Sequence, residues 1–150
     1  MRPVLSALIV ACAPLAAASA QRAEYAVKIV CGPPDHPAVA NGYYYTAINI
    51  HNPSREAARL RWKIALTLPK VQPGPITTFF DAVLKPDQAL EIECRDIRDR
   101  APKLPFFKGF VVIQSDTEFD VVGVYTAAQS PDGRVVALEI ERVPVRRPTQ

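Results

Sequence analysis

Residues 60–68 read LRWKIALTL, a run in which every second side chain is apolar. The apolar positions are Leu60, Trp62, Ile64, Leu66 and Leu68, and the positions between them are Arg61, Lys63, Ala65 and Thr67. A period of two is typical of a β-strand with one face in the core and the other toward water. The stretch therefore predicts a half-buried strand, with Trp62 at the centre of the core.

Similar runs occur along the rest of the chain. Further strands are predicted at residues 24–31, 43–51, 77–84, 88–95, 109–115, 119–127 and 134–143. Their β-branched and aromatic content favours strand over helix. Turn signals separate the runs, and Pro131-Asp132-Gly133 is the strongest of them. Short strands at this spacing predict an all-β fold, a single antiparallel β-sandwich of immunoglobulin-like type with about seven or eight strands.

Two stretches are expected to lie outside the strands. Residues 69–75 read PKVQPGP, which predicts an extended loop. Residues 96–103 are charged enough for a turn of helix, but Pro102 and Pro105 would end it. We therefore expect no helix in the domain.

The N-terminus has the features of an export signal. These are Arg2, an apolar stretch at residues 4–13, a helix breaker at Pro14 and the small residues Ala18-Ser19-Ala20. They predict a signal peptide at residues 1–20, and a mature protein in the periplasm or outside the cell with no remaining membrane span. The β-sandwich domain is then expected at residues 21–142. Residues 143–150, rich in arginine and proline, are expected to form a flexible C-terminal tail.

The three cysteines have different expected roles. Cys12 lies inside the signal, where Ile9-Val10-Ala11-Cys12 resembles a bacterial lipoprotein box; in this alternative interpretation Cys12 is lipidated and anchors the protein. Cys31 and Cys94 remain in the mature chain, each in phase with the apolar face of its own predicted strand. In an oxidising compartment they are predicted to form a disulfide. Two buried free thiols, or a bridge between two chains, are the alternatives.

Charge and residue types limit the classes of function. The chain carries a net charge of +3, which does not favour general nucleic-acid binding. Ser54, Ser115 and Ser130 lie in predicted turns, without a Gly-x-Ser-x-Gly context. His36 and His51 have no further ligands at the spacing of a zinc or copper site. We therefore predict that the protein is not an enzyme and has no catalytic residue, no cofactor and no metal site.

A candidate partner surface follows from the facing of two consecutive strands. Its outward residues are Tyr43, Tyr45, Arg59, Arg61 and Lys63. If Asn52-Pro53-Ser54 opens a hairpin, strand parity places Asn49 opposite Arg61 and Tyr45 opposite Ala65. Tyrosine beside arginine is common at recognition surfaces, and the expected partner is an acidic protein or an anionic envelope polymer. An ordinary solvated sheet would have the same composition.

Several stretches together resemble a group of exported bacterial and archaeal proteins with no assigned activity. They are Cys31-Gly32, residues 45–53 (YTAINIHNP), 73–75 (PGP), 87–94 (DQALEIEC), 108–115 (KGFVVIQS) and 121–127. The resemblance implies a β-sandwich that retains both cysteines, and implies no substrate. In strand order and loop style the chain is also similar, more distantly, to the sensory rhodopsin transducer family of oligomeric β-sandwiches. That likeness makes a homo-oligomer a property to test.

The sequence thus predicts a non-catalytic exported domain that binds a protein partner or a cell-envelope component. The alternative function is a periplasmic carrier of a small ligand or a metal. A carrier would need His36, His51 or the carboxylates to converge in a concave pocket.

Overall fold

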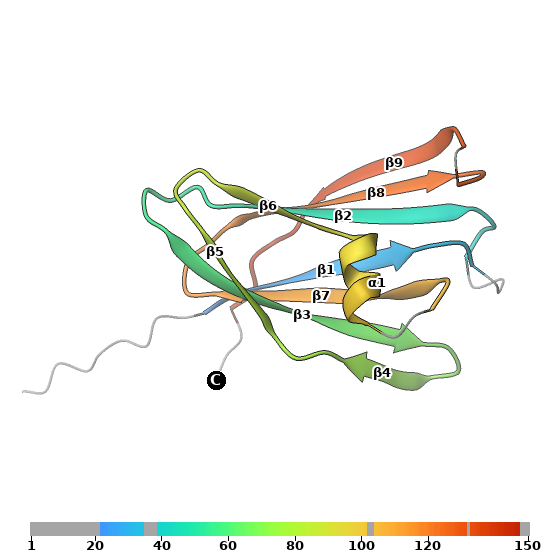
Figure 1. Ribbon diagram of the computed structural model, residues 1–150, viewed down its shortest axis with the longest axis horizontal. Coiled ribbons are helices and arrows are strands. Elements are labelled where there is room, and N and C mark those ends of the chain that lie inside the picture. The colour runs from blue at the N-terminus through green and yellow to red at the C-terminus, as the bar shows by residue number, and fades with distance from the viewer. Residues whose placement is uncertain (1–21, 35–38, 102–103, 132, 148–150) are drawn as a thin grey trace, which may run out of the picture.

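Two antiparallel sheets pack face to face in the computed structural model, which describes residues 22–34, 39–101, 104–131 and 133–147 (Figure 1). Sheet A consists of β1 (Ala23–Cys31), β7 (Phe107–Ser115), β3 (Ala58–Leu68), β4 (Gln72–Ile76) and β5 (Phe80–Leu84). Sheet B consists of β6 (Ala89–Glu93), β2 (Tyr43–His51), β8 (Asp120–Ala128) and β9 (Val135–Arg142). The predicted all-β sandwich is confirmed. The predicted signal peptide and His36 lie outside the described residues.

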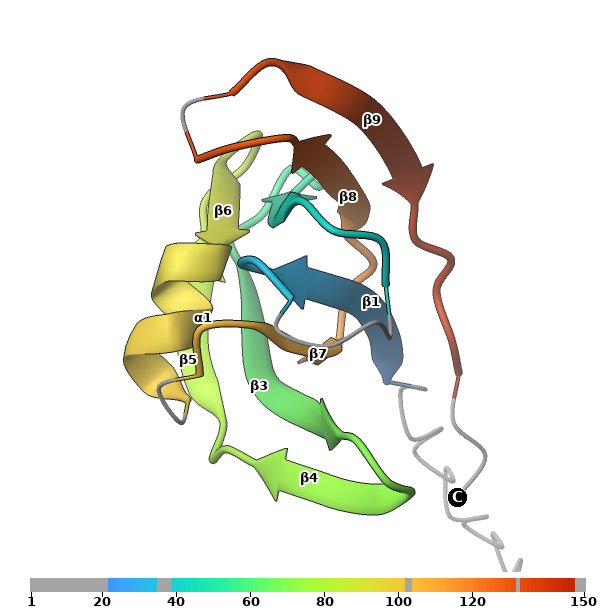
Figure 2. The same cartoon turned by 90° about the vertical axis from the view of Figure 1, so that its right-hand side faces the viewer.

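Strand order follows from the pairing. Sheet A runs β1-β7-β3-β4, and β5 pairs with the first half of β3 while β4 pairs with the second half. Sheet B runs β6-β2-β8-β9. Figure 2 shows the helix α1 (Cys94–Arg100) along one side of the sandwich, beside β6 and β5, with β9 on the opposite side.

The core is built from the alternate residues that the period of two predicted. Trp62 is only 6% exposed, and its ring centroid lies 4.8 Å from that of Phe80. The Tyr25 hydroxyl donates to the Phe119 carbonyl at 2.9 Å and accepts from the Phe119 amide at 2.8 Å. Tyr25 thereby ties β1 to the connection between β7 and β8, where the chain passes from one sheet to the other.

The predicted hairpin between β2 and β3 is wrong, because the chain changes sheets there. Asn52, which is completely buried, holds this crossing. Its side-chain nitrogen lies 2.8 Å from the Glu56 carbonyl oxygen, 3.0 Å from that of Leu84 and 3.1 Å from that of Lys85. Its side-chain oxygen accepts from the amide and the hydroxyl of Ser54. One side chain therefore joins the β2–β3 crossing to the β5–β6 crossing.

Two local predictions also fail. Residues 72–76, expected to be loop, form β4, because prolines are tolerated on an edge strand that needs few amide donors. The predicted strand at 88–95 ends at Glu93, where α1 begins. A capping box starts this helix, since the Glu93 amide donates to the Asp96 carboxylate at 2.9 Å. Pro102 and Pro105 lie beyond its last residue, so they do not prevent it.

The predicted flexible tail is wrong as far as Arg147. Val143 is buried, and its amide donates to the Val121 carbonyl at 2.9 Å. Arg146 and Glu24 exchange two backbone hydrogen bonds of 2.9 and 2.7 Å. The segment therefore continues the sandwich by crossing from sheet B to the free edge of β1, where the alternating Val143 and Val145 pack against the core. Residues 148–150 lie outside the described part of the chain.

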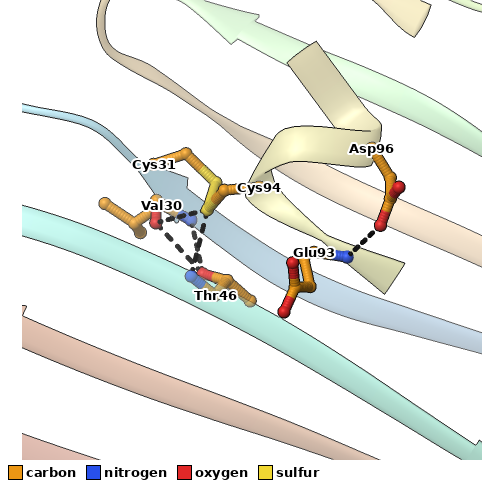
Figure 3. Close-up of a disulfide and its surroundings, with 6 residues drawn as sticks. All are labelled: Val30, Cys31, Thr46, Glu93, Cys94 and Asp96. Atoms are coloured by element: carbon orange, nitrogen blue, oxygen red, sulfur yellow. Dashed lines mark hydrogen bonds between the residues drawn. A yellow bond between two sulfur atoms is a disulfide. The ribbon is translucent and has the colours of Figure 1, made fainter. Parts of the chain in front are cut away.

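The predicted disulfide between Cys31 and Cys94 is confirmed, with a Cα–Cα distance of 5.7 Å (Figure 3). It joins the end of β1 to the first residue of α1, and so links the two layers. Thr46 is buried beside it: its amide donates to Cys94 Sγ at 3.1 Å. The Thr46 hydroxyl accepts from the Val30 amide and donates to the Val30 carbonyl, each at 3.1 Å. These bonds satisfy the amide and carbonyl groups of Val30, on the edge of β1 that faces away from β7.

Candidate binding surface

The candidate partner surface predicted from the sequence does not form as one surface. Tyr43 and Tyr45 lie on the outer face of sheet B, where Tyr45 is 43% exposed. Arg59, Arg61 and Lys63 lie on the outer face of sheet A. The error comes from strand pairing, because β2 pairs with β6 and β8 and not with β3. All five side chains do point outward, as the alternation along each strand predicted.

The three basic residues of β3 have different neighbours instead. β7 pairs with β1 on one side and β3 on the other, which brings Lys28, Lys108 and Phe110 onto the same outer face. We define the basic face as Lys28, Arg59, Arg61, Lys63 and Lys108 together with the rings of Phe79 and Phe110. The alternation of apolar and polar residues indicates that Lys28 and Lys108 point outward from their strands. That they share one face with Arg61 depends on the strand order, which the alternation does not determine.

Aromatic rings and hydrogen bonds hold the basic side chains in place. The Arg61 guanidinium carbon lies 4.3 Å and Lys63 Nζ 4.9 Å from the centroid of the Phe79 ring. Lys28 Nζ lies 4.8 Å from the centroid of the Phe110 ring. Arg61 also donates twice to Gln114 Oε1, at 3.0 and 2.8 Å. Such contacts reduce the freedom that long cationic side chains lose on binding a ligand.

Carboxylates lie only at the Arg61 end of the basic face, where Asp81 is the cross-strand partner of Arg61 and Glu24 accepts a hydrogen bond from Gln114. Among the described residues, Lys28, Arg59, Arg61, Lys63 and Lys108 form no ion pair within 4.0 Å. Partial burial lowers the pKa of Lys28 below its ordinary value, and the charge of Lys108 lowers it further. The face therefore has a positive potential that a bound anion would relieve.

His51 lies at one end of sheet B between two carboxylates. Its Nδ1 is 3.4 Å from Asp120 Oδ2, and its Nε2 is 3.2 Å from Asp87 Oδ1. Arg142 donates to the other Asp120 oxygen at 2.9 Å, so Asp120 already has a cationic partner. Within the described ranges no group of three or more His, Cys, Asp or Glu side chains is arranged to hold a metal ion.

A groove of about 690 Å³ lies where sheet B extends past the edge of β1. Its lining includes Lys28, Tyr44, Tyr125, Glu139 and Glu141, so Lys28 of the basic face also reaches this groove. The Tyr125 hydroxyl donates to Glu141 Oε2 at 3.0 Å. Burial raises the pKa of Tyr125 above its ordinary value, and so do the hydrogen bond to Glu141 and the charges of both glutamates. The groove therefore combines aromatic rings with two carboxylates and one lysine, Lys28.

Comparisons with known proteins give a fold but no function. No protein-family model matches the chain, and no curated protein is similar to it in sequence. Among solved structures, the crystal structure titled Thermotoga maritima 1070 is similar, with a TM-score of 0.51 and 10% sequence identity over 86% of this chain and 97% of that chain. This likeness extends to the fold alone. In the part of the chain that the structure describes, no helix has the length and hydrophobicity needed to cross a membrane.

Proposed function

We propose that this protein is a non-catalytic exported domain whose basic face binds an anionic polymer of the cell envelope. The single observation that supports this best is the diagonal placement of Lys28 beside Lys108 on the outer face of sheet A, with Lys63 in the next row and none of the three in an ion pair within 4.0 Å among the described residues. Like charges placed together are unfavourable unless a ligand neutralises them. The aromatic rings under these cations favour an ordered, repeating contact along an extended anionic chain.

Calorimetric titration with dextran sulfate tests this proposal, with neutral dextran as the control for the polysaccharide backbone. The triple variant Lys28→Gln/Lys63→Gln/Lys108→Gln should bind about tenfold more weakly or worse, and binding should weaken with added salt. The control triple variant is Lys85→Gln/Arg95→Gln/Arg134→Gln, which removes the same charge away from the basic face. Equal losses in the two variants would mean that net charge alone drives binding, and would contradict the proposal. Poly-L-glutamate distinguishes an acidic polypeptide from a polysaccharide as the preferred partner.

Export is a separate part of the proposal. The signal at residues 1–20 supports it, and the Cys31–Cys94 disulfide is compatible with an oxidising compartment. The intact mass of the exported protein should correspond to a chain that begins at Gln21. A diacylated product that begins at Cys12 would instead support the lipid-anchored alternative.

A second candidate function is supported by the groove beside β9. Two carboxylates next to tyrosine rings suit a small organic cation, because such ions are attracted to both. Titration with tetramethylammonium should then show binding that Glu139→Gln/Glu141→Gln abolishes. Because Lys28 lines the groove and also belongs to the basic face, the two functions are separated with Lys63→Gln/Lys108→Gln, which changes no residue of the groove: it should weaken dextran sulfate binding and leave tetramethylammonium binding unchanged.

A further inference from the structure

Sheet A does not extend beneath β9, the last strand of sheet B (Figure 2). Every residue of β9 is exposed, including Glu139 and Glu141, which pair with inward-facing positions of β8 and so lie on the inner face of sheet B. On the same inner face Val121 of β8 is buried and Tyr125 is only half-buried. The cover that sheet A provides therefore ends under β8.

The strand of sheet A that borders this uncovered region is β1, and its free edge is already paired near both ends. Glu24 exchanges two backbone hydrogen bonds with Arg146 at the start of the strand. The Thr46 hydroxyl bonds the amide and the carbonyl of Val30 near the other end. Because alternate residues of an antiparallel strand bond opposite neighbours, the even-numbered residues of β1 direct their backbone groups to this edge and the odd-numbered ones bond β7.

Between these two points the edge of β1 is open. Ala26 and Lys28 direct their amide and carbonyl groups to it, and no described group bonds them. The open stretch from Glu24 to Val30 is roughly 20 Å long at about 3.3 Å per residue, which is enough for an extended segment of about five residues. An unpaired strand edge is a ready template for pairing with another chain.

The groove of about 690 Å³ lies along this edge, with Lys28 and Val30 on its β1 side and Glu139 and Glu141 on its β9 side. A segment laid along β1 would direct every second side chain toward sheet B, where these carboxylates lie. The ammonium group of Lys28 does not occupy that place, because it lies 4.8 Å from the centroid of the Phe110 ring on the outer face of sheet A. The charges of the groove therefore favour a cationic side chain at the inward positions of the segment.

We propose that the groove accepts an extended peptide segment of another protein as an additional strand beside β1, with a lysine or arginine side chain directed at Glu139 and Glu141. The proposal rests on the cation site proposed for this groove, and it assigns the cation to a polypeptide. Strand addition of this kind gains affinity from main-chain hydrogen bonds and specificity from alternate side chains. Here the main chain bonds Ala26 and Lys28, and the residue between these two contacts points toward sheet B.

Amide hydrogen exchange, followed by NMR with and without the peptide acetyl-Thr-Lys-Thr-Lys-Thr-amide, tests the added strand. In the free protein the amides of Ala26 and Lys28 should exchange rapidly, whereas those of Val27 and Ile29, which bond β7, should be protected. Saturating peptide should slow exchange at Ala26 and Lys28 by about tenfold or more. Unchanged exchange at these two amides would overturn the proposal. Protection that rises with protein concentration before any peptide is added would mean that a second copy occupies the edge, and would also overturn it.

A backbone-modified peptide separates strand addition from simple attraction of charge. Methylation of the amide nitrogen of the central threonine keeps both lysines but removes one main-chain donor, so this peptide should bind about tenfold more weakly or worse. Equal binding of the two peptides would refute strand addition. The cation site itself would then still be judged by tetramethylammonium, which has no amide donor.

A matched pair of variants locates the peptide in the groove. Glu139→Gln/Glu141→Gln should weaken binding of the unmodified peptide about tenfold or worse. Glu56→Gln/Glu91→Gln removes the same charge from the β2–β3 connection and from β6, and should leave binding unchanged. Equal losses in the two double variants would contradict the placement of the peptide between β1 and β9.

Discussion

Replacing Asn52 by alanine is expected to lower the free energy of unfolding by about 2–5 kcal/mol. The change removes the group that holds two crossings between the sheets together. The Leu84 carbonyl, which Asn52 contacts at 3.0 Å in a buried setting, would lose this partner at a cost of about 1–3 kcal/mol. The contacts with Glu56 and Lys85 are partly open to water, so each contributes about 0.5–1 kcal/mol.

Urea unfolding followed by the fluorescence of Trp62, the single tryptophan, measures this effect. Asn49→Ala is the matched control. It makes the same substitution three residues earlier in the chain, on the outer face of β2, where Asn49 forms no side-chain hydrogen bond with the described residues. It should change stability by no more than about 0.5 kcal/mol. If Asn52→Ala costs no more than Asn49→Ala, the argument that Asn52 holds the crossings is wrong.

Asn52→Asp separates the role of the amide donor from that of side-chain shape. At neutral pH a carboxylate would point at three carbonyl oxygens, so we expect a larger loss than for alanine. The pKa of this aspartate would be raised in the folded protein. Its destabilising effect should therefore diminish as the pH falls and the folded protein takes up a proton. A loss that does not change with pH would contradict this account.

Three further predictions concern local features of the fold. Changing both Cys31 and Cys94 to serine should lower the free energy of unfolding by about 4 kcal/mol, and Ellman titration of the unfolded, unreduced mature protein should find no free thiol. Lys70 and Val71 have φ angles of 63° and 57° in the turn between β3 and β4, so replacing them by Asn-Gly should raise stability by about 1 kcal/mol, seen as a higher urea midpoint at constant m value. Because the pKa of Tyr125 is raised by folding, its contribution to stability is present below about pH 10 and is lost as the pH rises further; Tyr125→Phe should make the fall in stability above about pH 10 shallower.

Strand positions and facing were predictable because burial imposes a period of two on each strand separately. Trp62 and Cys31 lie on inner faces for this reason, and Cys94 is buried too, although it begins α1 instead of continuing a strand. The capping box at Glu93 and Asp96 was missed, since a glutamate in the N-cap position with an aspartate three residues later departs from the usual pattern.

Strand neighbours were not predictable from the same pattern. Whether Asn52-Pro53-Ser54 closes a hairpin or carries the chain to the other sheet depends on carbonyl groups more than thirty residues away, at Leu84 and Lys85. That one choice separated Tyr43 and Tyr45 from Arg61 and put Lys28 and Lys108 on the same face of sheet A as Arg61. The local sequence determines on which face of its strand a side chain lies. Long-range contacts determine which strands pair, and therefore which side chains share one surface.

An NMR titration of isotope-labelled protein with dextran sulfate tests the proposed binding function most directly, because it locates the bound polymer on the surface. The account predicts that the amide signals of Lys28, Lys63, Lys108 and Phe110 on sheet A shift together and saturably, and that those of Tyr45 and Leu138 on sheet B do not. Shifts concentrated on sheet B, or spread over all exposed cations alike, would contradict the assignment of the basic face as the binding surface.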